Sequence, residues 1–389
     1  MKIIKLPFRV RKPILACGAD LKGAFALAKG YKAYLFDGFG DLSDLDNFTR
    51  YERAIHAAEK KLDIRPKIIA CDLHPDYFST QFARKNRDRH HFSGKGAHRK
   101  IVSVPIFQVQ HHEAHIASAI IDNCIKGEVL GAAFDGTGYG ADGNIWGGEF
   151  FAGKIGSLKR VAHLEYIPMP GGEMCIKEPW RMAASYLWKN RKKNRDRHLF
   201  YHKLCSENRC LSLFLKKMIE NKINSPLTSS MGRLFDAAGS IILNKRLASF
   251  EAELPIKLEK IADKNEKGYY DFDLKKGDGK IVINMAGTIR GILKDLDKNI
   301  SRPKISAKFH NTIAHMILKA AKIFDLKKVV LSGGVFQNKF LVQRMRELLE
   351  DHGFKVYTHS NVETNDSGIP IGQIAIANER PSAFAINKQ

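Results

Sequence analysis

Two histidines, His111 and His115, lie four residues apart in the stretch HHEAHIASAI. If this stretch is helical, both imidazoles lie on one face of the helix, one turn apart. That spacing allows two side chains to reach one metal ion. A histidine pair on an amphipathic helix is also often a surface or hydrogen-bonding feature, so the spacing alone leaves both interpretations open.

Two aspartates in glycine-containing turns supply oxygen donors that match this pair. Asp135 ends an apolar, strand-like run in AFDGTGYG, and Asp366 lies in TNDSGIPIG. Two neutral imidazoles and two carboxylates form a candidate site for Fe(II) or Zn(II). The glycines after Asp135 also suit the approach of a phosphate to backbone N–H groups, because glycine has no side chain in the way.

Length and composition exclude several classes of protein. The 389 residues suffice for two or three domains, and an apolar fraction of 44% supports globular cores. No apolar run reaches the length of about 18 residues that a membrane span needs, and the basic N-terminus has too short an apolar part for a signal peptide. The six cysteines form no CxxC pair, and their scatter predicts reduced thiols in a cytoplasmic protein.

The formal net charge of +23 is the compositional outlier. It raises the question of polyanion binding. The positive charge is densest at residues 84–100 and 189–197, and neither run has the interleaved aromatic residues of a base-stacking platform. Solvated, lysine-rich loops are therefore preferred to nucleic-acid binding as the interpretation.

Strand-like and helical patterns alternate along the chain, which favours an α/β fold. Residues 13–30 are predicted to form a strand, a glycine turn and a helix, and a hairpin is expected at residues 267–273. Related strand–turn–strand units in the two halves predict two α/β lobes with a cleft between them. The glycine turns would face this cleft, where open α/β sheets commonly bind ligands.

The expected boundaries follow from this pattern. The N-terminal lobe covers residues 12–126 and ends in the histidine helix. The C-terminal lobe covers residues 127–380, with a helical insertion at about 175–308. Residues 381–389 are expected to form a frayed tail.

Several motifs occur in a specific order along the chain. They are GADLKG, HPDYFST, VQHHEAHIAS, AFDGTGYGADGNIWGGEF, PGG with KEPWRMA, SSMGRLFDA, LSGGVFQN and NDSGIPIGQ. Together they resemble the C-terminal domain of the HypF carbamoyltransferase family, over roughly residues 12–380. The ordered set makes the resemblance specific, whereas any one motif alone would be weak.

The resemblance implies the fold of the actin-like ATPase superfamily, with two RNase-H-like lobes, and a similarity to the tRNA threonylcarbamoyltransferases. It also implies an activity. The HypF family passes a carbamoyl group from carbamoyl-adenylate to the C-terminal cysteine of the partner HypE. The resulting thiocarboxamide is later dehydrated to the cyanide ligand of nickel–iron hydrogenase, so a HypE-like acceptor is the expected partner.

The resemblance assigns expected roles to individual residues. The implied metal ligands are His111, His115, Asp135 and Asp366. The implied contacts of the nucleotide (carbamoyl-adenylate, ATP or AMP) are Gly136, Thr137, Gly138, Asp236, Gly333, Gly334 and Asn338. Independently of the resemblance, Lys22 in GADLKG is a candidate to contact a ligand phosphate or close the cleft. For Lys22, a solvated position is the alternative. His112 and Glu113 are candidate general bases, with solvent-facing helix positions as the alternative.

The chain also departs from the family pattern. In the family, an acylphosphatase-like domain, zinc-finger modules and a YrdC-like domain precede the domain that this chain resembles. We therefore expect the chain to lack the parts that hydrolyse carbamoyl phosphate and make the adenylate. A separate YrdC-like protein would supply the adenylate, unless the chain is an excerpt or a specialised paralogue. Glu113 stands where the family usually has histidine.

Two other functions stay open at this point. The first is a carbamoyltransferase that modifies a small molecule or tRNA, and the charge of +23 would favour the RNA. The second is a non-catalytic nucleotide-binding paralogue. In that paralogue, His111→Ala and Asp366→Ala would leave function in cells unchanged.

Overall fold

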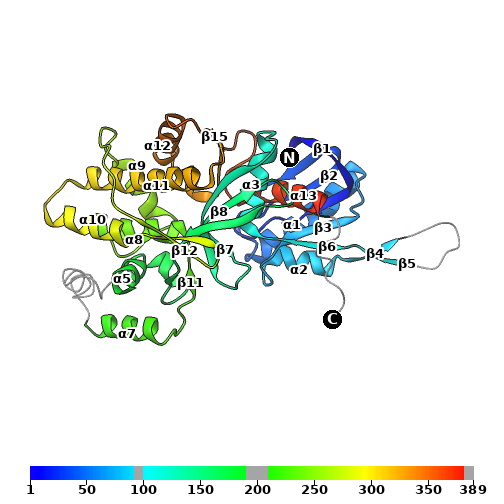
Figure 1. Cartoon of the computed structure of the whole chain (residues 1–389). Coiled ribbons are helices and arrows are strands. Elements are labelled where there is room, and N and C mark those ends of the chain that lie inside the picture. The colour runs from blue at the N-terminus through cyan, green and yellow to red at the C-terminus, as the bar shows by residue number, and fades with distance from the viewer. Residues whose placement is uncertain (92–99, 190–208, 381–389) are drawn as a thin grey trace.

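The structure, a computed structural model, describes residues 1–91, 100–189 and 209–380 (Figure 1). The tail expected at residues 381–389 lies outside the described residues. Over the described ranges, no helix has the length and apolar character needed to cross a membrane. The chain folds into two α/β lobes, each built on its own sheet, which confirms the predicted fold class (Figure 1).

The first lobe contains a sheet with the strand order β2-β1-β3-β6. β1 and β2 pair antiparallel, whereas β1, β3 and β6 run parallel to one another. A separate ribbon is formed by β4 and β5. The elements of this lobe are β1 (Lys2–Ala16), β2 (Phe25–Phe36), α1 (Leu45–Leu62), β3 (Ile68–Asp72), α2 (Phe78–Lys85), β4 (Asp88–His91), β5 (Lys100–Ser103) and β6 (Ile106–Val109).

The second lobe contains a larger sheet, with the main order β12-β13-β9-β8-β7-β14-β15. β7, β8 and β9 form an antiparallel meander, and β14 and β15 extend it parallel to β7, which is an RNase-H-like arrangement. The strands are β7 (Val129–Tyr139), β8 (Ile145–Gly153), β9 (Lys159–Leu164), β10 (Ile167–Pro168), β11 (Leu227–Thr228), β12 (Asp273–Gly277), β13 (Lys280–Asn284), β14 (Lys328–Ser332) and β15 (Lys355–Tyr357). The helices are α4 (Met174–Lys177), α5 (Trp180–Lys189), α7 (Arg209–Glu220), α8 (Met231–Leu243), α9 (Glu253–Ile261), α10 (Ala286–Asp297), α11 (Arg302–Phe324) and α12 (Lys339–Glu350), with the 3-10 turns η2 (Gly334–Gln337) and η3 (Asp366–Gly368).

Two helices lie where the lobes meet, α3 (His111–Asp122) and α13 (Ile369–Glu379). The apolar residues of α3 divide between two cores. Ala114 packs with α13 in the first lobe, whereas Ile116 and Ile120 pack with β7 and β14 of the second. A helix that is apolar on both sides is buried in this way. In Figure 1, α13 lies beside β1 and β2, so the last described helix packs on the first strands.

Two local predictions were wrong, and a third was incomplete. The helix expected after the turn in residues 13–30 is part of strand β2, because pairing with β1 overrides the helix propensity of its alanine, leucine and lysine residues. The hairpin expected at residues 267–273 forms instead between β12 and β13, around Asp278 and Gly279. β13 then pairs with β9, so the segment expected as a helical insertion also extends the larger sheet.

Candidate metal and nucleotide site

The first turn of α3 brings the two histidines to the junction of the lobes. The side-chain oxygen of Gln110 accepts the backbone N–H of Glu113 at 2.9 Å, which caps the helix and starts it at His111. His111 and His115 therefore lie one turn apart on the same face. Both imidazoles are buried, so the alternative of a surface pair does not apply.

Asp135 and Asp366 approach this pair from two other elements. Asp135 lies in β7, where an irregularity interrupts the pairing with β8. Asp366 is the first residue of the turn η3, after Asn365, whose side chain accepts the backbone N–H of Ser367 at 3.0 Å. An interrupted strand and a capped turn thus direct two carboxylates toward one helix.

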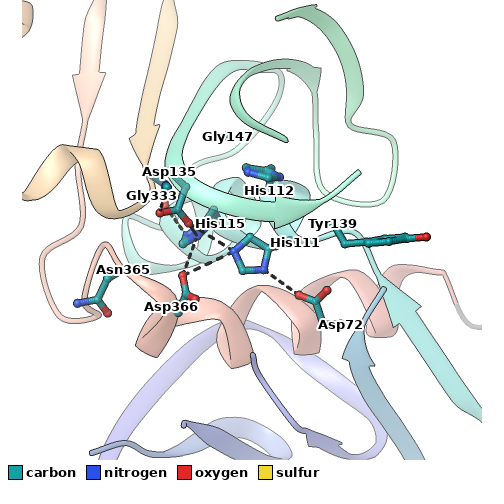
Figure 2. Close-up of polar contacts among 12 residues, drawn as sticks. Asp72, His111, His112, His115, Asp135, Tyr139, Gly147, Gly333, Asn365 and Asp366 are labelled. Atoms are coloured by element: carbon teal, nitrogen blue, oxygen red, sulfur yellow. Dashed lines mark hydrogen bonds and ion pairs between the residues drawn. The ribbon is translucent and has the colours of Figure 1, made fainter. Parts of the chain in front are cut away.

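The four side chains converge on one region (Figure 2). Nε2 of His115 lies 3.1 Å from Oδ2 of Asp135 and 3.5 Å from Oδ1 of Asp366. Nε2 of His111 lies 3.4 Å and 3.6 Å from the same two oxygens. One donor atom from each residue lies within 4.8 Å of the others. The structure therefore brings together all four residues that were expected as metal ligands.

Burial and charge act against each other in this cluster. Burial alone would lower the pKa of His111 and of His115, but the neighbouring carboxylates outweigh it and hold both pKa values above the ordinary value of 6.5. Burial would raise the pKa of Asp135 and of Asp366, but the imidazoles hold both pKa values below the ordinary value. Two buried carboxylates thus require positive charge beside them, either protons on the imidazoles or a metal ion.

The donor set fits a metal ion with mixed nitrogen and oxygen ligands. Nε2 of His111 is buried and lacks a hydrogen-bond partner among the described residues. It nevertheless faces the carboxylates of Asp135 and Asp366 (Figure 2). A bound cation would satisfy this nitrogen, and two imidazoles with two carboxylates suit Fe(II) or Zn(II). The identity of the metal stays a prediction.

Asp72 is a residue of this site that the sequence analysis missed. It ends β3, and its Oδ2 lies 2.8 Å from Nδ1 of His111 (Figure 2). A carboxylate in this position holds the proton on Nδ1 and leaves Nε2 free for a metal. The available signal was an aspartate at the carboxyl end of a buried strand, where α/β sheets place ligand-binding residues. Its pairing with His111 is visible only in three dimensions.

A cleft of about 380 Å³ opens beside Asp135 and Asp366. Its other walls come from α8, from residues 251–259 in and before α9, from η2, and from Leu21 and Lys22 of the first lobe. Four of the expected nucleotide contacts line this cleft: Lys22, Gly136, Gly334 and Asn338. The other four expected contacts are not among its lining residues: Thr137, Gly138, Asp236 and Gly333.

Three of these four residues shape the surroundings of the cleft. A Cβ added to Gly138 would lie 2.4 Å from Cε1 of His112, so a side chain there would displace the imidazole. Gly333 adopts a φ of 106°, which favours glycine. Asp236 forms an ion pair with Arg233, with 2.7 Å between Oδ2 and Nε, and Arg233 itself lines the cleft.

His112 and Glu113, the candidate bases, do not line the cleft. His112 is buried, and burial together with the cationic neighbour His111 holds its pKa well below the ordinary value. Glu113 is buried and accepts a hydrogen bond of 2.6 Å from Nη2 of Arg380. The solvent-facing alternative is therefore wrong for both residues.

Known protein families match nearly the whole chain. Residues 9–122 match the "HypF Kae1-like domain", and residues 131–373 match "Carbamoyltransferase, Kae1-like Domain, second subdomain". A Carbamoyltransferase HypF from Synechocystis is 33% identical over 95% of this chain and 48% of its own length. A Carbamoyltransferase HypF homolog from Cupriavidus necator is 31% identical over 95% of this chain and 93% of its own length.

Solved structures agree with these matches. A crystal structure of full-length HypF in a phosphate- and nucleotide-bound form has a TM-score of 0.88 and 36% identity, covering 98% of this chain and 48% of that chain. The chain thus spans about half the length of these longer relatives, whereas it spans nearly all of the Cupriavidus homolog. The chain therefore belongs to the HypF carbamoyltransferase family, and it corresponds to the Kae1-like domain of that family.

Proposed function

We propose that this chain transfers a carbamoyl group from carbamoyl-adenylate to a protein thiol, the C-terminal cysteine of a HypE-like partner, in the maturation of nickel–iron hydrogenase. The observation that carries the proposal is the cluster of four potential metal ligands, two of which also line the cleft. The names of the relatives support the transferase class. The nucleotide-bound relative supports a nucleotide in the cleft.

The transfer exchanges one bond for another. The bond between the carbamoyl carbon and the phosphate oxygen of AMP breaks, and a bond forms from that carbon to the thiolate sulfur. AMP is the leaving group, and the proton of the thiol passes to solvent. A carbamoyl carbon is a poor electrophile, because its nitrogen donates electrons into the carbonyl. When bound, a metal ion held by His111, His115, Asp135 and Asp366 supplies Lewis-acid polarisation of a carbonyl or phosphate oxygen.

Residues around the cleft position the nucleotide in this proposal. Gly136 and Gly334 keep the two walls beside Asp135 free of side chains, so a phosphate can approach the backbone. Arg233 places a cation at the cleft, and its contact with Asp236 restricts its orientation. An oriented nucleotide presents its carbamoyl carbon in one geometry to the incoming thiolate.

The test reconstitutes the transfer with separate proteins. The metal-loaded chain is combined with a HypE-like acceptor and carbamoyl-adenylate. A YrdC-like protein generates the carbamoyl-adenylate in the same reaction mixture. We expect mass spectrometry to find one carbamoyl group on the C-terminal cysteine of the acceptor. Asp366→Ala should lose the transfer. The matched control Ser185→Ala removes a buried hydroxyl that donates to the carbonyl of Pro168, and it should retain the transfer.

Three results would contradict the proposal. They are an unmodified acceptor with a correctly folded, metal-loaded chain, full activity of Asp366→Ala, and transfer to tRNA or a small molecule in place of the acceptor. Full turnover by anaerobically purified protein that contains no metal would contradict the metal-dependent part.

A further inference from the structure

A row of polar groups leads from His115 into the second lobe, on the side opposite the candidate metal position. Oγ of Ser332, the last residue of β14, lies 3.5 Å from Nδ1 of His115. The same Oγ lies 2.8 Å from Nε2 of His359. The side chain of His359 is only 4% exposed, and its Nδ1 lies 3.7 Å from Oδ2 of Asp122. Nearly all of these atoms are removed from water.

The chemistry of these groups sets the direction in which hydrogen bonds are donated along the row, from His115 toward Asp122. If Nε2 of His115 holds a metal, Nδ1 carries the proton and faces Ser332 as a donor. The hydroxyl of Ser332 can then donate its own proton to Nε2 of His359. His359 is thereby left with its proton on Nδ1, which faces the carboxylate of Asp122. Nδ1 of His359 has no hydrogen-bond partner among the described residues, so this carboxylate gives it its nearest charge complement.

Asp122 also holds the chain segment that leads to Asp366. Its carboxylate accepts the backbone N–H of Ser360 at 2.6 Å and that of Asn361 at 3.0 Å. It also accepts from the side chain of Asn361 at 2.9 Å. Asp122 lies on α3, seven residues after His115 and therefore on the same face of the helix. The helix that carries both histidines thus fixes the loop that ends in the second carboxylate.

We infer that Ser332, His359 and Asp122 are positioning residues for the candidate metal site. Ser332 and His359 hold the imidazole of His115 in the orientation that directs Nε2 at the metal. Asp122 orients His359 and fixes the loop that delivers Asp366. This inference rests on the metal site of the proposed function. It adds that His115 is supported through three residues that do not themselves touch the metal: Ser332 and His359 from the second lobe, and Asp122 from α3 itself.

The test measures metal binding, not turnover. Purified full-length chain is stripped of metal and titrated with Co(II), whose visible spectrum reports the ligand geometry, and then with Zn(II) in competition with a chelator. Lost outer-shell partners typically weaken metal binding by roughly 10- to 100-fold. Because Ser332 is neutral and distant from Nδ1, we expect Ser332→Ala and His359→Leu to lie near the tenfold end. Both should also alter the Co(II) spectrum.

Two matched variants separate positioning from a loss of packing. His359→Gln retains an oxygen that can accept from Ser332, so it should recover most of the affinity lost in His359→Leu. Ser185→Ala, which removes a buried hydroxyl bond elsewhere in the lobe, should bind Co(II) as the wild type does. Equal affinity and identical spectra for Ser332→Ala, His359→Leu and wild type would overturn the inference alone. A wild-type chain that binds neither metal would overturn the proposed metal site and this inference with it.

The loop contact has its own measurement in the metal-free protein. Asp122→Ala removes the acceptor of the Ser360 and Asn361 backbone N–H groups. We expect faster amide hydrogen exchange in the segment that leads to Asp366, with the rest of α3 protected as in the wild type. Unchanged exchange in this segment would overturn the role given to Asp122.

Discussion

The two imidazoles of the candidate metal site are supported in different ways. On the side of the first lobe, Nδ1 of His111 faces the carboxylate of Asp72 at 2.8 Å, and both side chains are fully buried. On the side of the second lobe, Nδ1 of His115 faces the neutral hydroxyl of Ser332 at 3.5 Å. Hydrogen bonds to charged groups are roughly twice as strong as neutral ones. His111 is therefore the more firmly held ligand.

This difference shows how one helix serves two lobes. Both histidines lie on α3, but β3 of the first lobe supports His111, and β14 of the second lobe supports His115. His111 contacts a charged group, the carboxylate of Asp72, directly. His115 contacts the neutral hydroxyl of Ser332, Ser332 contacts His359, and only His359 lies beside a charged group, the carboxylate of Asp122. The orientation of the two imidazoles thus depends on both lobes, more directly on the first than on the second.

Removing either ligand should have the largest effect. We expect His111→Ala and His115→Ala each to weaken metal binding by more than about 100-fold, the upper end of the range for outer-shell losses. Chelator competition followed by elemental analysis measures this directly. Binding by either variant within tenfold of the wild type would show that the imidazole concerned is not a ligand, and the comparison of its support would lose its basis.

Removing the support of His111 should have the next largest effect. Asp72→Ala deletes a buried carboxylate, and we expect a loss of metal affinity of about 100-fold, against about tenfold for Ser332→Ala. Asp72→Asn keeps an acceptor for Nδ1 and should lie between these values. Side-by-side titrations test the order. Equal losses of metal affinity for Asp72→Ala and Ser332→Ala would contradict the claim that His111 is held more firmly than His115.

The effect of pH follows from the pKa shifts of the metal-free cluster. Both ligand imidazoles have pKa values above 6.5, so a metal must displace protons from them. Metal affinity should rise with pH, by up to about tenfold per pH unit for each displaced proton. A raised histidine pKa stabilises the fold fully below 6.5, and this contribution is lost as pH rises through the folded pKa.

Thermal unfolding checks the sign of this effect. As pH rises above 6.5, the unfolding temperature of the metal-free chain should fall, while that of the metal-loaded chain should not. His112, whose pKa is lowered, contributes in the opposite direction, and its contribution is lost only below its ordinary value of 6.5. Parallel curves with and without metal would contradict the assignment of the protons to this cluster.

A substitution beside the rings tests how tightly the His111 side is packed. A Cβ at residue 138 would lie 2.4 Å from Cε1 of His112 and 3.0 Å from Cδ2 of His111. Gly138→Ala should therefore displace the rings and weaken metal binding by up to about tenfold. Gly277→Ala, where the nearest contact is an ordinary 3.9 Å, serves as the control. Wild-type metal affinity in Gly138→Ala would show that the rings of His111 and His112 can move without a loss of metal binding.

The smallest effect on metal binding should come from a change at the opposite face of α3, where Glu113 pairs with Arg380. Arg380→Ala leaves the buried carboxylate of Glu113 without its cation. Because Arg380 is 26% exposed, we expect a loss of about 1 to 3 kcal/mol in unfolding free energy, less than for a fully buried pair. Metal affinity should stay as in the wild type. Urea denaturation and Co(II) titration separate the two effects, and a loss of metal binding would contradict this division of the helix.

Several features of the site were predictable from local patterns. Once a helix is assumed, the spacing of His111 and His115 predicts that both side chains lie on one face, because residues four apart in a helix are one turn apart. Asp135 stands out because it ends an apolar run in a glycine-rich turn, and Asp366 because it lies in a second glycine-containing turn. Alternating strand and helix patterns predicted the α/β class, because each pattern also depends only on residues close together in the sequence. These signals need only a few neighbouring residues.

Other features were decided only by the tertiary structure. The first part of β2, up to Gly30, was predicted as a helix because its alanine, leucine and lysine residues favour helices locally, and pairing with β1 reversed that preference. Asp72 lies 39 residues before His111, and Ser332 lies 217 residues after His115. No local periodicity links residues at such separations. Packing of α3 between the lobes alone turns an isolated aspartate and an ordinary serine into the supports of the two imidazoles.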